Sequence, residues 1–238
     1  MKYTLHKAKD RGVAEFGWLH SRHSFSFGEY YNPDKMGFGL LRVLNDDIIE
    51  PGEGFGTHPH NNMEIISIPL EGSLEHKDSM GTGSVITVGE VQVMSAGTGI
   101  THSEFNPSRV EEGKFLQLWI IPKERNIKPR YDQKRFDFDN LKNSIAIVVT
   151  GTKSDSTLYI HQNATVSLGK LDKGNKLSYK NLYKGNGSFL LVLDGSIFFE
   201  NIELTKRDAV GIYETDEFTF NASSDANFII VEVPMNIS

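Results

Sequence analysis

Short apolar runs of strand length alternate with glycine-containing turns along most of the chain. Runs of four to eight β-branched, aromatic and aliphatic residues between turns are typical of β-strands. The predicted strands are residues 39–44, 63–70, 84–88, 91–94, 115–121, 145–149, 165–168, 189–193, 196–200 and 228–233. Helical periodicity is weak, and we expect only one short helix, near residues 129–141. Regularly spaced short strands predict an all-β protein built from sandwiches or barrels, with few short helices.

A basic segment, residues 123–135, follows Pro122, contains Pro129 and separates two halves of similar size. We interpret it as a solvated linker and predict domains at residues 1–125 and 135–238. Residues 70–75 and 193–198 also resemble each other, since both place an acidic residue, Gly and Ser between two apolar stretches. This faint repeat is what two copies of one barrel would give.

Composition narrows the possible chemistry. The 238 residues contain no cysteine, which excludes disulfides, iron–sulfur clusters, thiolate zinc sites and cysteine nucleophiles. The first 20 residues carry charges throughout, and no stretch of 18 apolar residues occurs, so we expect a cytoplasmic protein without a signal peptide or membrane helix. The net charge of −6 disfavours direct nucleic-acid binding, and the basic segment 123–135 has no aromatic residue except Tyr131.

Histidines give the strongest chemical signal. Seven of the eight precede the basic segment, and two of them form the sequence His58-Pro59-His60. The sequence His102-Ser103-Glu104 repeats this spacing with an imidazole and a carboxylate. On a strand, residues i and i+2 face the same side, so two such pairs on neighbouring strands would direct three nitrogens and one oxygen at one point. That donor set suits iron, manganese, cobalt, nickel, copper or zinc.

The histidine pairs lie in longer stretches that resemble one protein family. The sequence GEGFGTHPHNNME at residues 52–64 looks like the first cupin motif in the variant of the pirin family. The similarity extends over about residues 22–122. It includes residues 25–31 (FSFGEYY), 39–47 (GLLRVLNDD), 76–81 (HKDSMG) and 94–106 (MSAGTGITHSEFN). The second half shows no comparable motif, although its length suits the shorter bacterial members, which have two cupin domains.

The resemblance implies a bicupin, that is, two tandem jelly-roll barrels with metal only in the first. It implies His58, His60, His102 and Glu104 as metal ligands, with iron(II) the expected divalent ion and Mn, Co, Ni, Cu or Zn as alternatives. Glu64 has the strand parity to share the face of His58 and His60, so it is either a ligand or a group that orients a histidine. The second barrel offers only His161, which has Tyr159 and Asn163 at the i±2 positions.

The resemblance also implies a function, a quercetin 2,3-dioxygenase activity that opens the central ring of a flavonol with O2 and releases carbon monoxide. Glu104 is then the catalytic residue that accepts the proton of the 3-hydroxyl group. Two alternatives stay open: a metal-binding regulatory pirin that acts on a protein partner without turnover, and a cupin oxygenase with a non-flavonol substrate. Phe55 and Met63 are close to the ligands in sequence and belong either to the substrate pocket or to the core.

Overall fold

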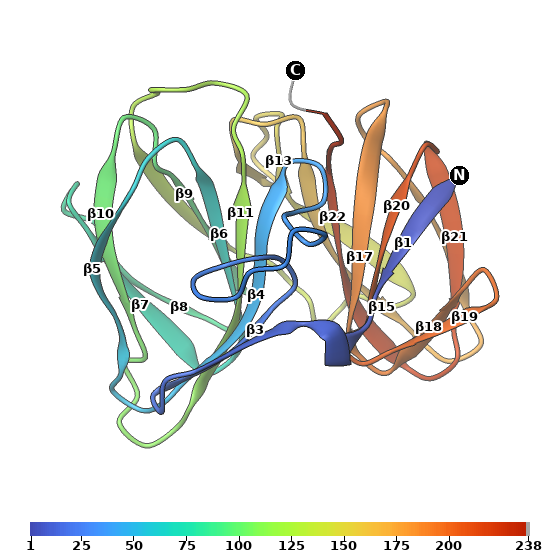
Figure 1. Cartoon of the computed structure of the whole chain (residues 1–238), viewed down its shortest axis with the longest axis horizontal. Helices are drawn as coiled ribbons and strands as arrows, with labels where there is room; N and C mark the ends of the chain where they lie inside the picture. Colours follow the sequence, from blue (N-terminus) through green and yellow to red (C-terminus); the bar gives the residue numbers. More distant parts are fainter. Residues whose placement is uncertain (237–238) are drawn as a thin grey trace.

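The computed structural model describes residues 1–236 and consists almost entirely of β-strands arranged as two barrels side by side (Figure 1). Among these residues the only helix is a 3-10 turn, η1 (Ala8–Asp10). The predicted all-β bicupin architecture is therefore confirmed. No helix in residues 1–236 is long and apolar enough to cross a membrane.

The first barrel combines a seven-stranded and a four-stranded sheet, on the left in Figure 1. The larger sheet has the order β12-β9-β6-β11-β4-β3-β2, and the smaller one β5-β10-β7-β8. Their bounds are β2 Gly12–Glu15, β3 Leu19–His23, β4 Leu41–Ile49, β5 Gly54–His60, β6 Glu64–Glu71, β7 Ser73–Asp78, β8 Gly83–Thr87, β9 Glu90–Ser95, β10 Ile100–Phe105, β11 Gly113–Ile120 and β12 Arg130–Arg135.

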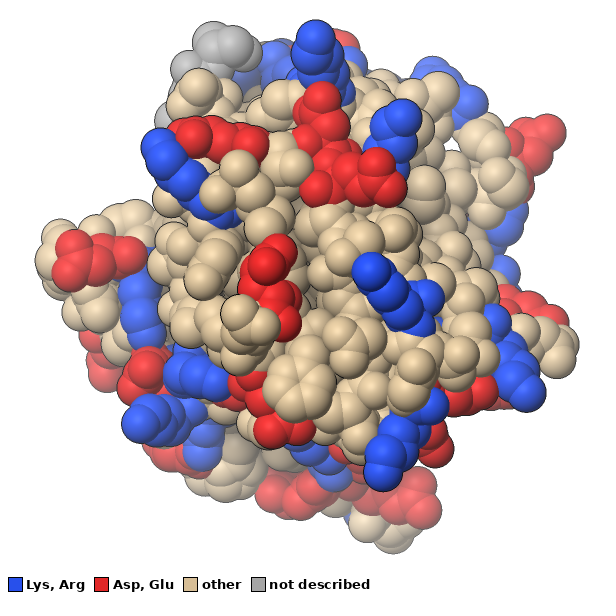
Figure 2. All heavy atoms as spheres, turned by 90° about the vertical axis from the view of Figure 1, so that its right-hand side faces the viewer, with Lys and Arg blue, Asp and Glu red and all other residues tan. Residues whose placement is uncertain are grey.

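The second barrel repeats this division into seven and four strands, with the orders β1-β20-β17-β22-β15-β13-β14 and β16-β21-β18-β19. The bounds are β1 Lys2–His6, β13 Ser144–Thr150, β14 Leu158–Tyr159, β15 Thr165–Leu171, β16 Lys176–Lys180, β17 Asn186–Asp194, β18 Ser196–Phe199, β19 Ile202–Thr205, β20 Ala209–Tyr213, β21 Glu217–Ala222 and β22 Ala226–Pro234. Figure 2 views this barrel from outside and shows acidic and basic side chains interspersed over that face, as the small net charge suggests.

All ten predicted strands occur, with ends shifted by a few residues, but the segment around residue 130 differs from expectation. The predicted helix near residues 129–141 is wrong, because Arg130–Arg135 forms strand β12 and pairs with β9. The linker interpretation fails there for the same reason. Tyr131 and Gln133 hydrogen-bond each other and contact β9 and β8 through Gln92 and Ser84, so tertiary pairing overrides the weak local preference.

Strand pairing also crosses the predicted division of the chain. Strand β1 pairs with β20 in the sheet of the second barrel, although residues 2–6 belong to the first half of the sequence. The boundaries 1–125 and 135–238 stay a prediction, and β1 ties the start of the chain to the second barrel.

The two large sheets pack against each other, and this contact forms the main core. Leu116 and Leu118 on β11 share one buried cluster with Phe189 and Leu191 on β17. Alternate residues of these strands point into the barrels, where the two halves differ. The second barrel is filled by an apolar cluster, whereas the first barrel places Gln117 inside. The second barrel also buries a carboxylate, Glu232, but hydrogen bonds from Tyr179 and Asn186 occupy it, whereas the interior of the first barrel holds several histidines.

Candidate metal centre

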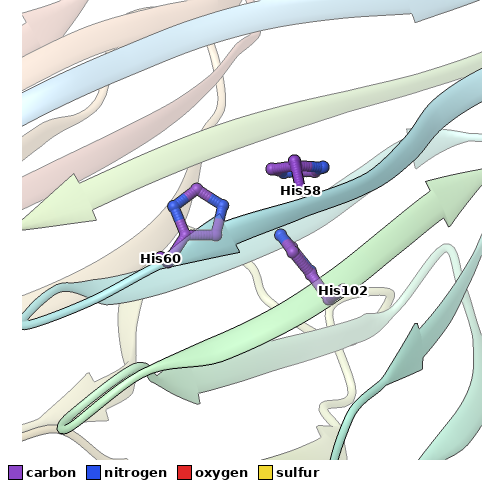
Figure 3. A group of neighbouring side chains, drawn as sticks. All are labelled: His58, His60 and His102. Atoms are coloured by element: carbon purple, nitrogen blue, oxygen red, sulfur yellow. The ribbon is translucent and has the colours of Figure 1, made fainter.

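Strands β5 and β10 bring the two predicted histidine pairs together. They are antiparallel neighbours, and His58 lies directly opposite His102. Candidate ligand nitrogens of His58, His60 and His102 all lie within 4.8 Å of one another, and their three rings converge in Figure 3. A β-bulge follows, since the next paired residues are Glu104 and Phe55. The bulge adds its residue to β5 and leaves the parity of β10 unchanged, so His102 and Glu104 share a face.

Two of the three imidazoles, His60 and His102, are held neutral, which is the form that binds metal. Burial lowers the pKa of His60 to about 4, and burial followed by the neighbouring histidines lowers that of His102 to about 2. Nδ1 of His58 lies 2.8 Å from the carbonyl oxygen of Gly56, which can only accept, so Nδ1 donates and Nε2 keeps its lone pair. Among the described residues, buried Nε2 of His102 has no hydrogen-bond partner. The unpartnered Nε2 of His102 beside two further imidazoles fits a divalent metal ion.

Glu104 lies beside this group and is fully buried. Its carboxylate accepts hydrogen bonds from Gln117 Nε2 at 2.8 Å and Ser67 Oγ at 3.2 Å. Burial raises its pKa, and the hydrogen bonds oppose that shift in part. A ligand oxygen of Glu104 falls within 4.8 Å of nitrogens of His102 and His76, in a second donor group that overlaps the first at His102. The four-ligand assignment of His58, His60, His102 and Glu104 stays a prediction.

Glu64 belongs to neither donor group and faces elsewhere. Its carboxylate accepts a hydrogen bond from Ser95 at 2.7 Å and lies 3.5 Å from Nδ1 of His161 in the second half of the chain. Burial raises the pKa of Glu64 to about 7. The expected shared face with His58 and His60 is wrong because Asn62, with φ of 45°, turns the chain into another sheet and breaks the parity.

His76 is the buried histidine that the sequence reasoning missed as part of the site. It is completely buried on β7, opposite Glu104 on β10, and its Nε2 lies 3.1 Å from Asp78 Oδ2. A signal was present, since His76-Lys77-Asp78 is a third pair with the i and i+2 spacing. Spacing alone could not place β7 next to β10.

A cavity of about 630 Å³ opens beside the histidines. Its aromatic lining consists of Phe16, Phe27, Tyr30, Phe55 and Trp119. His58, His60 and Glu104 line the same cavity. Of the two uncertain apolar residues, Phe55 lines this cavity, whereas Met63 packs against the cluster of Ile65, Met94, Ala96 and Ile100. Aromatic walls around a few polar groups are typical of pockets for flat organic ligands.

Comparison with known proteins identifies the family. Residues 6–120 match the family Pirin, and residues 147–233 match the Quercetinase C-terminal cupin domain. The chain belongs to the pirin family. It is 41% identical over 230 residues to Quercetin 2,3-dioxygenase of Escherichia coli (strain K12), covering 97% of this chain and 98% of that protein. The "Pirin-like protein" of Caulobacter vibrioides is 36% identical over 222 residues, covering 93% and 95% of the two chains.

Solved structures of pirins agree with this assignment. The bacterial pirin YhhW from Escherichia coli in complex with nickel(II) has a TM-score of 0.92 and 39% identity, over 98% of this chain and 99% of that one. This chain is thus related over 97% of its length to an oxidoreductase, a protein named quercetin 2,3-dioxygenase. Its His and Glu donor groups are of the kind that binds a divalent metal ion.

Proposed function

We propose that this pirin is a metal-dependent dioxygenase that cleaves flavonols such as quercetin with O2 and releases carbon monoxide. One observation carries the proposal: three imidazoles converge beside an aromatic cavity into which the buried carboxylate of Glu104 also faces. The name of the relatives, quercetin 2,3-dioxygenase, supports the same substrate class.

His58, His60, His102 and Glu104 are the residues that would hold the ion, for which iron(II) is our expectation. Nickel(II) in the YhhW structure shows that a pirin site accepts a divalent ion from this range. A bound divalent ion would increase the acidity of a flavonol 3-hydroxyl group and favour its enolate form, the electron-rich partner for O2.

The chain's own residues orient the substrate and move its proton. Trp119 and Phe55 contact His60 and His58 and provide flat surfaces beside the histidines. The cavity excludes water from the aromatic body of a flavonol and keeps its oxygen atoms toward the histidines. Glu104 accepts the 3-hydroxyl proton, and its raised pKa brings it closer to the value of an effective base at neutral pH.

The test compares metal-loaded and metal-free protein in the presence of quercetin. Oxygen uptake with equimolar carbon monoxide release by the loaded protein alone would support the proposal. Metal binding without any turnover would overturn it in favour of the regulatory alternative. Oxygen uptake with other enediols or catechols, and none with flavonols, would overturn the substrate assignment and favour the non-flavonol oxygenase.

A further inference from the structure

A row of polar side chains crosses the large sheet of the first barrel behind the histidines. Successive strands place these residues directly opposite one another: Gln133, Gln92, Ser67, Gln117, Asn45 and His23. Ser67 and Gln117 from this row hold Glu104, as described above. Gln92 contacts the other buried group, His76, with its amide nitrogen 3.5 Å from Nδ1 of the ring. Polar side chains in register on six strands thus lie behind the histidines, where they can orient the buried groups of the site.

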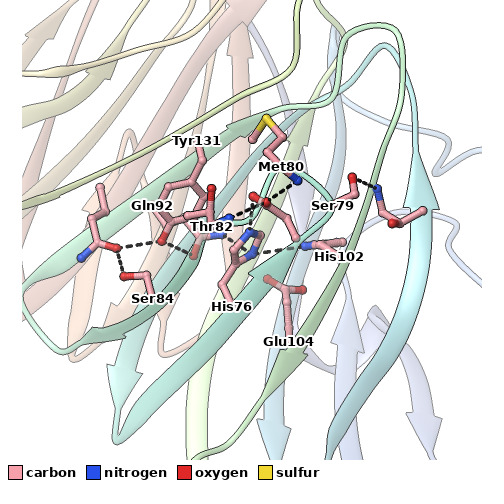
Figure 4. Close-up of polar contacts among 12 residues, drawn as sticks. His76, Ser79, Met80, Thr82, Ser84, Gln92, His102, Glu104 and Tyr131 are labelled. Carbon is pink, nitrogen blue, oxygen red and sulfur yellow. Dashed lines mark hydrogen bonds and ion pairs between the residues drawn. The ribbon is translucent and has the colours of Figure 1, made fainter.

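His76 links His102 to a buried carboxylate, as Figure 4 shows. Asp78 Oδ2 lies 3.1 Å from Nε2 of His76, and Nδ1 of His76 lies 3.4 Å from Nδ1 of His102. The other oxygen of Asp78, Oδ1, accepts the backbone N–H groups of Met80 and Thr82 at 2.9 and 3.0 Å. Asp78 is thereby fixed with one particular oxygen facing His76.

Asp78 determines which atoms donate and which accept in the hydrogen bonds that link it through His76 to His102. A carboxylate only accepts, so Nε2 of His76 carries a proton and donates to Asp78. Nδ1 of His76 is the acceptor, because the amide nitrogen of Gln92 faces it and can only donate. Nδ1 of His102 carries a proton and shares this acceptor with Gln92, because an unprotonated Nδ1 would set two lone pairs against each other at 3.4 Å. Nε2 of His102 is left with a lone pair, and it is the buried nitrogen without a partner.

We infer that His76 and Asp78 are positioning residues of the metal centre, which fix His102 as the Nδ1–H tautomer and present its Nε2 to the ion. The inference rests on the metal site of the proposed function and decides between the two overlapping donor groups. Both nitrogens of His76 are used in hydrogen bonds, so His76 is not a ligand. The ion therefore binds at the donor group formed by His58, His60 and His102. The nitrogen that a histidine offers to a metal is set by the hydrogen bond of its other nitrogen.

Nitrogen-15 NMR of the histidine rings in metal-free wild-type protein tests the tautomers directly. We expect His102 protonated on Nδ1 and His76 protonated on Nε2. A His102 ring protonated on Nε2, or a doubly protonated His76, would overturn the inference. This measurement needs neither metal nor substrate, so it stands even if flavonol turnover is absent.

The substitution Asp78→Asn provides a second test because it should reverse the direction of the hydrogen bonds that link residue 78, His76 and His102. The two backbone N–H groups hold the amide oxygen at the Oδ1 position, so the amide nitrogen takes the Oδ2 position and donates to Nε2 of His76. His76 then donates from Nδ1, and His102 becomes protonated on Nε2. We expect nickel(II) affinity, measured against a competing chelator, to fall about 10–100-fold.

The matched control is Glu75→Gln, which neutralises an acidic residue on the same strand whose partner is the exposed Lys77. It should keep wild-type nickel affinity. Thermal melting of each metal-free variant shows whether the fold is retained. Wild-type affinity in a folded Asp78→Asn protein would overturn the inference. If His58→Ala also leaves nickel affinity unchanged, the proposed metal site fails, whatever the NMR result.

Discussion

The substitution Glu104→Gln separates the chemistry of the site from its stability. The glutamine has the shape of the glutamate, and both of its polar atoms find partners. Its oxygen accepts from Gln117 Nε2, and its amide nitrogen donates to Ser67 Oγ, whose proton turns from residue 104 to the oxygen of Gln117 at 3.1 Å. Each of the two polar atoms thus has a hydrogen-bond partner in the variant, and we expect the fold to be retained.

Loss of the carboxylate should remove the proton acceptor. General-base catalysis contributes about 10²–10⁴-fold in rate, or about 3–5 kcal/mol of barrier, and this is the loss we expect in flavonol turnover. The free energy of unfolding, in contrast to the turnover rate, should not fall in this variant. Because burial raises the pKa of Glu104 in the folded state, ionisation favours unfolding as the pH rises above the ordinary value for a glutamate. The metal-free variant should therefore melt at or above the wild-type temperature at pH 8, with the difference shrinking in acid.

The assay measures oxygen uptake with quercetin at equal metal content, verified by elemental analysis, together with melting of the metal-free proteins. Glu112→Gln, at an exposed position, is the control and should change neither quantity. Wild-type turnover by Glu104→Gln would refute the role of Glu104 as base. A lower melting temperature would refute the hydrogen-bond argument.

Three further predictions address the metal site, the pH dependence and a turn. His60→Ala should lower the metal content and abolish flavonol turnover, and a normal content by elemental analysis would contradict the ligand set. Burial raises the pKa of Asp47 to about 7, so Asp47→Asn should become more stable relative to wild type as the pH rises from about 4 to about 7, by on the order of 4 kcal/mol, in urea unfolding. The exposed control Asp139→Asn should show no such trend, and a pH-independent difference for Asp47→Asn would contradict its cause. Gly195 has φ of 74°, and an added Cβ would lie 1.8 Å from the oxygen of Asp225. Gly195→Ala should therefore lower the free energy of unfolding by about 1–3 kcal/mol or more. An unchanged melting temperature would show that the turn relaxes freely.

Apolar strands could be predicted from the sequence, whereas the polar strands of the site could not be predicted from hydrophobicity. Residues 115–121 alternate toward two buried faces and were recognised as a strand, now β11. Strands β5 and β10 carry His, Gly, Thr and Glu and lack an apolar face, so only their histidine spacing marked them. The helix predicted near residues 129–141 is wrong because the pairing of β12 with β9, a distant segment of the chain, decides its conformation.

What the sequence determined by itself is local: the strand periodicity, the turns and the i and i+2 pairs that put His58 with His60 and His102 with Glu104 on common faces. The tertiary structure decided which strands are neighbours, and thereby which pairs meet. It set β10 between β5 and β7, which added His76 to the site, and it turned Glu64 toward His161 in the other half of the chain. Side-chain alternation has a period of two and is fixed by the backbone, whereas pairing and register depend on contacts between distant segments, which no short stretch of sequence encodes.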